Sequence, residues 1–347
     1  MASNSRRNEI FNFNDVINSN DLRKQIVNVD SRFRDSATKE LSTNYQYTFE
    51  HPYKNVIRIR IASVEIPNSW YEFSAANHNT SFVISAYDIS NNLRTVTIQI
   101  ADGNYGAIDL LTTIQAQFVS KLQTPYGIFM SIYPNPFSLK STIELRGVAA
   151  VGAAAPTATG QPFYLNFIMT ATANQPFNWG LGYNLGFRSL RYTVNTITDV
   201  SGGISTYSVQ SESLIDVTAE NYVFLAVNDY YTVENKNTIG FTQALAKIIV
   251  RDAKFSILFD DGGSLLSNDV IFPSPIDLKR IQVKLLDAYG QVIDLNGLNF
   301  SFSLEITEVT NTKMYEFYRN YIWLGTVPSL PSNVTGSGMG LLGGKGP

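Results

Sequence analysis

The chain has 347 residues, of which 44% are hydrophobic and only 16% are charged, and its formal net charge is −3. Because soluble domains usually carry roughly 25% charged residues, we expect part of this surface to be buried in a permanent assembly. The weak negative charge gives no support for wrapping nucleic acid. The absence of cysteine excludes disulfide bonds, thiolate zinc sites and cysteine nucleophiles. No apolar run reaches the roughly 18 residues of a membrane span, and the polar start lacks the apolar core of a secretion signal.

Residues 1–40 predict an N-terminal extended arm. They are rich in Asn, Ser, Asp and Arg, with short apolar islands such as Ile10-Phe11 and Ile26-Val27. Such a segment buries too little apolar surface to offset its own ordering entropy. Two alternatives stay open: the arm orders on a neighbouring subunit, or it is a disordered terminus.

Alternating apolar and polar residues predict strands through the middle of the chain. In residues 56–61 (VIRIRI), the two-residue period places Ile57, Ile59 and Ile61 on one face and Arg58 and Arg60 on the other. A final hairpin is predicted to pair residues 280–286 with 298–307. Further strands are predicted at residues 45–49, 64–66, 81–87, 94–100, 128–133, 138–145, 163–169, 222–227 and 246–250.

The period changes once in this region. Ile108, Leu111, Ile114 and Phe118 are spaced by three and four residues, which predicts a helix at 107–122. Short strands about every ten residues, with one or two helices, predict an all-β fold: an antiparallel jelly-roll sandwich with extended terminal arms. A parallel α/β sheet would need a helix after nearly every strand, so that class is excluded.

These elements predict a single jelly-roll domain over residues 41–310. A long polar stretch near residues 188–220 predicts an insertion within it. Residues 311–347 predict a short helix followed by a flexible Gly-rich tail.

The residue types of catalysis and metal binding are sparse, so we expect no catalytic, cofactor or metal site and no enzyme activity. The only histidines, His51 and His78, are not spaced as metal ligands. Asp260 and Asp261 are adjacent, and neighbouring side chains of a strand point to opposite faces, which favours a polar turn. A hydrolase would require these two carboxylates and a general acid to share one pocket.

Several motifs, taken in their order along the chain, resemble a capsid-protein family of the nucleocytoplasmic large DNA viruses (giant viruses). The resemblance covers roughly residues 27–310. The motifs are residues 27–35 (VNVDSRFRD), 55–68 (NVIRIRIASVEIPN) leading into Trp70-Tyr71, 102–105 (DGNY), 182–188 (GYNLGFR) and 222–230 (YVFLAVNDY).

Proteins of that family have jelly-roll domains that lie beneath or between the major-capsid trimers or form the five-fold vertex. The resemblance therefore implies a minor capsid or penton protein that links or closes the lattice of major capsid proteins. It implies a virion protein assembled in the host cytoplasm, in homo- or hetero-oligomeric contact with the major capsid protein and other minor capsid proteins. The vertex and cementing positions both stay open.

Other partners follow from charge and from aromatic residues. The basic residues of the arm are diluted among acidic ones, so direct contact with nucleic acid is not expected. Contact with an inner membrane surface is kept as an alternative. Trp70, Tyr71 and Trp179 favour a different function, a carbohydrate- or receptor-binding β-sandwich on the particle surface.

Overall fold

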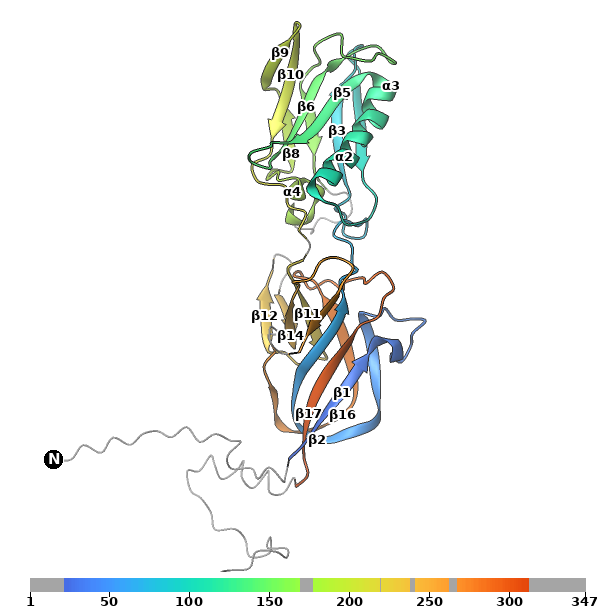
Figure 1. Ribbon diagram of the computed structural model, residues 1–347, viewed down its shortest axis with the longest axis vertical. Helices are drawn as coiled ribbons and strands as arrows, with labels where there is room; N and C mark the ends of the chain where they lie inside the picture. Colours follow the sequence, from blue (N-terminus) through green and yellow to red (C-terminus); the bar gives the residue numbers. More distant parts are fainter. Residues whose placement is uncertain (1–21, 169–176, 219, 238–240, 262–266, 312–347) are drawn as a thin grey trace, which may run out of the picture.

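The computed structural model describes residues 22–168, 177–218, 220–237, 241–261 and 267–311. The fold is all-β and jelly-roll-like, with antiparallel sheets arranged in two lobes stacked along the long axis of the molecule (Figure 1). The upper lobe is inserted between strands β2 and β11 of the lower lobe. Each lobe buries its own large apolar cluster, so the structure has two cores where the sequence predicts one domain.

The lower lobe is built on a seven-stranded antiparallel sheet in the order β1-β17-β2-β16-β11-β14, with β15 also paired to β2. A separate two-stranded ladder joins β12 (Val233–Lys236) to β13 (Phe241–Ala244). The strands of the large sheet are β1 (Leu22–Asp30), β2 (Asn44–Pro67), β11 (Tyr222–Val227), β14 (Ala246–Ile249), β15 (Ile257–Asp260), β16 (Val270–Leu286) and β17 (Ser301–Val309).

Two long strands curl this sheet into two layers. β2 has 24 residues and β16 has 17, and their register shifts repeatedly between Ile271 and Arg280. The first part of β2 pairs with the end of β16, whereas the second part pairs with β17. Because bulges bend strands and increase their twist, the same two strands contribute to both layers. The apolar cluster between the layers includes Tyr45 and Phe302, both fully buried.

Bulges in β2 change which side chains face this core. The register with β17 shifts at Ile57 and again at Ala62. Ile59 and Ile61 therefore lie in the large cluster, whereas Ile57 packs against Val309 in a small separate one. The prediction that all three isoleucines share one face is wrong for Ile57, because each bulge reverses the two-residue period.

The structure differs from the predictions made from the sequence in two strand pairings of the lower lobe. The predicted hairpin is wrong, because β16 and β17 both pair with β2, which lies between them. Residues 22–30, predicted as part of the arm, form β1 and pair with β17 along their whole length. Val29 is fully buried, so this segment belongs to the core. Residues 1–21 and the predicted helix and tail beyond residue 311 lie outside the described residues.

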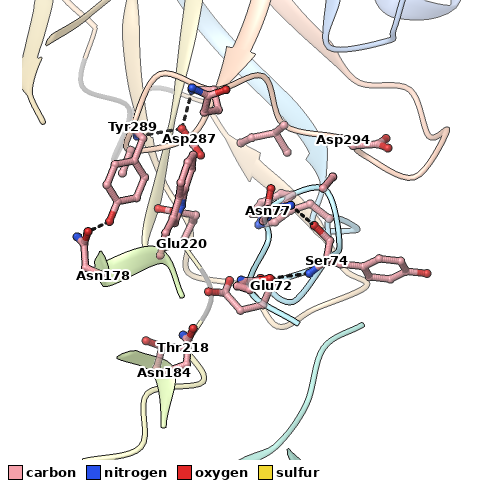
Figure 2. A pocket seen from close by; sticks show the side chains of 18 of the residues that line it. Glu72, Ser74, Asn77, Asn178, Asn184, Thr218, Glu220, Asp287, Tyr289 and Asp294 are labelled. Carbon is pink, nitrogen blue, oxygen red and sulfur yellow. Dashed lines mark hydrogen bonds between the residues drawn. The ribbon is translucent and has the colours of Figure 1, made fainter. Parts of the chain in front are cut away.

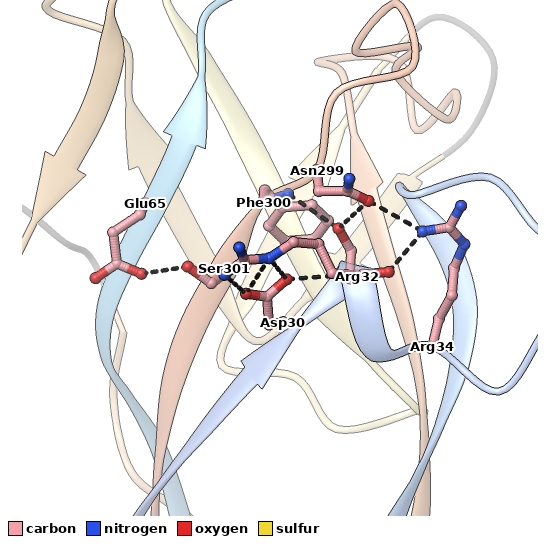
Figure 3. A network of polar contacts seen from close by, with 8 residues as sticks. Asp30, Arg32, Arg34, Glu65, Asn299, Phe300 and Ser301 are labelled. Atoms are coloured by element: carbon pink, nitrogen blue, oxygen red, sulfur yellow. Dashed lines mark hydrogen bonds and ion pairs between the residues drawn. The ribbon is translucent and has the colours of Figure 1, made fainter. Parts of the chain in front are cut away.

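A polar network fixes the end of β1 (Figure 3). Asp30 accepts hydrogen bonds from the amide and guanidinium of Arg32, which lies in the short helix η2 (Ser31–Phe33). Arg34 donates to the carbonyl oxygens of Ser31 and Ala37 and to the side-chain oxygen of Asn299 at 3.0 Å. The motif of residues 27–35 thus ties the first strand to the segment that leads into β17.

The upper lobe packs two four-stranded sheets face to face. Their orders are β4-β3-β7-β8 and β5-β6-β10-β9. The polar stretch predicted as an insertion supplies β8, β9 and β10 of these sheets. The strands are β3 (Ser81–Tyr87), β4 (Leu93–Gln99), β5 (Ile128–Pro134), β6 (Ser141–Val148), β7 (Phe163–Asn166), β8 (Arg191–Val194), β9 (Ile197–Ser201) and β10 (Ile204–Gln210).

Helix α2 (Ala107–Phe118) lies where the sequence predicts a helix. Leu111, Ile114 and Phe118 are buried in the upper core, as their spacing predicts. The helix continues through a π-helical turn, η3 (Val119–Gln123), and α3 (Thr124–Tyr126). It ends at Gly127, whose φ of 65° suits glycine because this residue has no Cβ. Two short helices follow β7, η4 (Phe177–Trp179) and α4 (Leu181–Asn184), and α4 lies at the base of the lobe (Figure 1).

Candidate functional site

A cavity of about 480 Å³, open to solvent on one side, lies where the chain passes between the two lobes. The first crossing, residues 68–80, follows β2, and the second, residues 211–218 and 220–221, precedes β11. The third wall is the β16–β17 loop, residues 287–300. Figure 2 shows side chains of all three segments around the cavity, among them Glu72, Glu220 and Asp287.

Side-chain amides hold the first crossing to the lower lobe. The amide of Asn68 donates to the carbonyl oxygens of Asp252 at 2.9 Å and Ala253 at 3.2 Å. The amide of Asn296 donates to the carbonyl oxygen of Ser69 at 2.6 Å. These bonds satisfy backbone carbonyls that leave the sheet, so Asn68 at the end of the second motif is an anchor.

The motif of residues 102–105 holds the same crossing to the upper lobe. The side chain of Asn104 accepts a bond from the amide of Glu72 at 2.8 Å and donates to the carbonyl oxygen of Trp70 at 3.3 Å. The carboxylate of Asp102 accepts from the amide of Ala75 at 2.9 Å. Both lobes therefore fix the position of Trp70 and Glu72.

We use "joint" for the two crossings and the β16–β17 loop together. Lys254 contacts the joint from the lower lobe. Its ammonium donates to the carbonyl oxygen of Trp70 at 3.1 Å and lies 4.5 Å from the centroid of the Trp70 ring. Burial lowers the pKa of Lys254 to about 8, and the nearby carboxylates of Glu72 and Glu220 oppose this shift.

Three carboxyl groups at the cavity have raised pKa values. Burial is the main cause in each: the pKa is about 7 for Glu72, about 8 for Glu220 and about 6 for Asp287. The charges of Asp287 and Glu72 raise the pKa of Glu220 further, and the charge of Lys254 opposes the rise at Glu72. These three groups come from the first crossing, the second crossing and the β16–β17 loop, and their raised pKa values mean that the region between the lobes changes charge near neutral pH.

Aromatic side chains line a further part of the cavity. The rings of Trp179, in η4, and Tyr289, in the β16–β17 loop, are 4.8 Å apart between centroids. Asn178 donates to the hydroxyl of Tyr289 at 2.6 Å. Asn184, in the motif of residues 182–188, donates to the carbonyl oxygen of Asp216 at 3.0 Å and so fixes the second crossing.

A family model matches residues 16–250, and its description is "Family of unknown function (DUF5901)". The chain belongs to this family. No curated protein matches the chain. A solved structure of the mavirus penton protein is similar with a TM-score of 0.40 and 8% identity, covering 83% of this chain and 100% of that one. A chain of the Sputnik virophage structure has a TM-score of 0.37 and 13% identity, covering 83% of this chain and 98% of that one. At these scores neither structure assigns a function to the DUF5901 chain.

The structure brings together the three aromatic residues predicted for ligand binding, Trp70, Tyr71 and Trp179, all of which line the cavity. The candidate hydrolase residues, Asp260 and Asp261, are not among the residues that line the cavity. Asp260 lies on β15 opposite Val64, away from the residues that line the cavity.

Sequence reasoning missed the carboxyl groups of the joint. Glu72, Glu220 and Asp287 come from three distant segments, and a single acidic residue carries no local signal. Within the described ranges, no three His, Cys, Asp or Glu side chains gather as metal ligands. No helix in the described part of the chain is long and apolar enough to cross a membrane.

Proposed function

We propose that this DUF5901 chain is a structural capsid component of a large icosahedral DNA virus, a minor capsid or penton protein that links or closes the lattice of major capsid proteins. The motif resemblance supports this role. In the structure, the same motifs stabilise the β body. Residues 27–35 fasten β1, residues 55–68 form most of the second half of β2, and residues 102–105 brace the joint between the lobes.

The observation that carries the proposal is an exposed apolar strip on the lower lobe. We use "outer strip" for Phe255, Ile257, Phe259 and Ile271, which are 74%, 66%, 63% and 67% exposed. Three of them, Phe255, Ile257 and Phe259, lie at alternate positions of one segment, and exposed apolar surface of this kind is typical of interaction sites.

The strand registers place Ile257, Phe259 and Ile271 on the face of the sheet opposite the core. Ile257 pairs with Pro67 and Phe259 with Glu65, whereas Leu258 between them is buried in the core. Ile271 pairs with Arg58. β15 and the start of β16 pair with successive parts of the same strand, β2, so their outward side chains line one side of it. A neighbouring subunit that covers this side removes the apolar surface from water.

The ends of the described chain favour the same role. Leu22, the first residue of β1, pairs with Val309, the last residue of β17. The described chain therefore begins and ends close together, at the same end of two paired strands. A segment of 21 residues spans at most roughly 70 Å when fully extended, which is enough to contact a subunit that the lobes do not touch.

In this role the chain contacts the major capsid protein and other minor capsid proteins in the virion, after assembly in the host cytoplasm. The inner membrane surface is a further contact to test. The role requires no catalytic centre. It requires a stiff β body, and the two packed cores supply that.

Localisation of the chain in purified particles by cryo-electron microscopy tests the proposal. Density for five copies around each vertex identifies a penton. Density along facet seams or beneath trimers identifies a minor capsid protein. A chain that is missing from mature particles, both in density and by mass spectrometry, is not a capsid component.

A further inference from the structure

The interlobe cavity has the size and lining of a ligand site. Its volume of about 480 Å³ lies within the roughly 300–1,000 Å³ of small-molecule sites. Segments of both lobes line it, and their own hydrogen bonds fix them in place. Six aromatic side chains contribute: Trp70, Tyr71, Trp179, Tyr183, Tyr222 and Tyr289.

The aromatic rings differ in what already covers them. The guanidinium of Arg188 lies 3.9 Å from the Tyr183 ring centroid, and the ammonium of Lys247 lies 3.9 Å from that of Tyr222. Tyr71 is still 37% exposed. Its ring, with the Trp179–Tyr289 pair, remains for a ligand.

Such rings suit one class of polar ligand. The face of an aromatic ring is electron-rich and attracts polarised hydrogen atoms. A pyranose sugar presents polarised C–H groups on one face and hydroxyl groups around its rim. It can therefore stack on a ring while its hydroxyls hydrogen-bond to the walls.

The polar side chains around these rings match hydroxyl groups. A hydroxyl both donates and accepts, and carboxamides and hydroxyls offer both functions in return. Asn178, Thr218 and Gln291 line the cavity with such groups. The hydroxyl of Tyr289 accepts a bond from Asn178, so its own hydrogen can be donated to a bound sugar.

The acidic side chains that line the cavity favour neutral sugars over anionic ones. An anionic sugar would bring a further negative charge to a site lined by six acidic side chains, so it is disfavoured. The carboxylates also accept hydrogen bonds from neutral hydroxyls. The acidic side chains that line the cavity are Glu72, Asp102, Asp216, Glu220, Asp287 and Asp294.

We propose that the cavity between the two lobes is a binding site for short neutral oligosaccharides, which stack on Tyr71 and on the Trp179–Tyr289 pair. This site does not depend on the capsid role. If the chain is present in particles but binds no glycan, the capsid role stands and this site is rejected. If it binds glycans but is missing from particles, the site stands and the capsid role is rejected.

The test is binding of the purified full chain to an array of neutral, sialylated and sulfated oligosaccharides, followed by calorimetric titration of the best neutral probe. We expect saturable binding of neutral probes and none of acidic ones. Tyr71→Ala and Trp179→Ala should each weaken that binding at least tenfold.

A matched control is Tyr164→Ala. Tyr164 is 39% exposed, close to the value of Tyr71, but it lies on β7 and does not line the cavity. This variant should bind like the unchanged chain. Tyr71→Ala alters a partly exposed side chain, so a normal melting temperature separates lost binding from lost folding. Absence of neutral binding, a preference for acidic glycans, or full binding by Tyr71→Ala would overturn the proposal.

Discussion

Ile57 and Ile59 are separated by one residue of β2 but pack on opposite faces of the sheet. Ile59 is fully buried in the large core, whereas Ile57 lies in a small separate cluster with Val309. The bulge at Ile57 causes the difference, because it adds one residue to β2 without a partner on β17.

Replacing Ile59 by Asp should therefore lower the free energy of unfolding by about 3 kcal/mol or more, since an unpaired charge would enter an apolar interior. Ile59→Val should cost only about 1 kcal/mol. Ile57→Asp should cost less than Ile59→Asp, because Ile57 has few buried neighbours. Chemical denaturation of the three variants measures the order, and equal losses at both positions would show that the bulge does not separate the faces.

The carboxyl groups of the joint should make stability depend on pH. The pKa values of Glu72 and Glu220 are raised to about 7 and about 8. A folded state with raised carboxyl pKa values binds more protons than the unfolded state, so its stability falls as pH rises from about 4.5 through these values. Above pH 8 the lowered pKa of Lys254 acts in the opposite direction.

Glu220→Gln should flatten this fall between pH 5 and pH 8, because a carboxamide does not ionise. Glu50→Gln, at an exposed position of β2, is the control and should keep the original slope. Thermal melting across this range gives the comparison. An unchanged slope in Glu220→Gln would exclude Glu220 as a source of the pH dependence.

Two N-terminal truncations should differ sharply. Removing residues 1–21 keeps every described strand, so the melting temperature should change little. Removing residues 1–30 deletes β1 with the buried Val29, which by itself contributes about 2 kcal/mol. Thermal melting tests the folded state, and incorporation into particles tests assembly. If the shorter truncation also melts much lower, residues 1–21 contribute to the fold.

The guanidinium of Arg34 should resist conservative replacement. It donates to Ser31, Ala37 and Asn299 through a planar fork that a lysine ammonium does not reproduce. Arg34→Lys should cost about 2 kcal/mol of stability, as expected for hydrogen bonds from a charged group. Arg23→Lys, at an exposed position of β1, should cost almost nothing. Similar stability of the two variants would contradict the anchoring role.

The outer strip should matter for assembly more than for folding. Phe259→Ser changes a side chain that is 63% exposed, so stability should stay within about 0.5 kcal/mol. Incorporation into particles should fall, because the neighbour loses an apolar contact. Phe137→Ser is the control, since Phe137 is 97% exposed and lies outside the strip. Normal incorporation of Phe259→Ser would remove the strip from the interface.

The sequence by itself determined the all-β class and the position of most elements, because periodicity is local. Residues 81–87 and 222–227 alternate or run apolar within one segment, and both are strands with the predicted bounds. The spacing of Ile114 and Phe118 likewise identified helix α2.

Only the tertiary structure decided which strands pair and where the site lies. β2 separates β16 from β17 although those two are consecutive strands, and β1 completes the sheet from the far end of the sequence. Such pairings depend on contacts between distant segments, which no local pattern encodes. The cavity has the same origin: Glu72, Glu220 and Asp287 acquire raised pKa values only because two chain crossings and a loop exclude water around them.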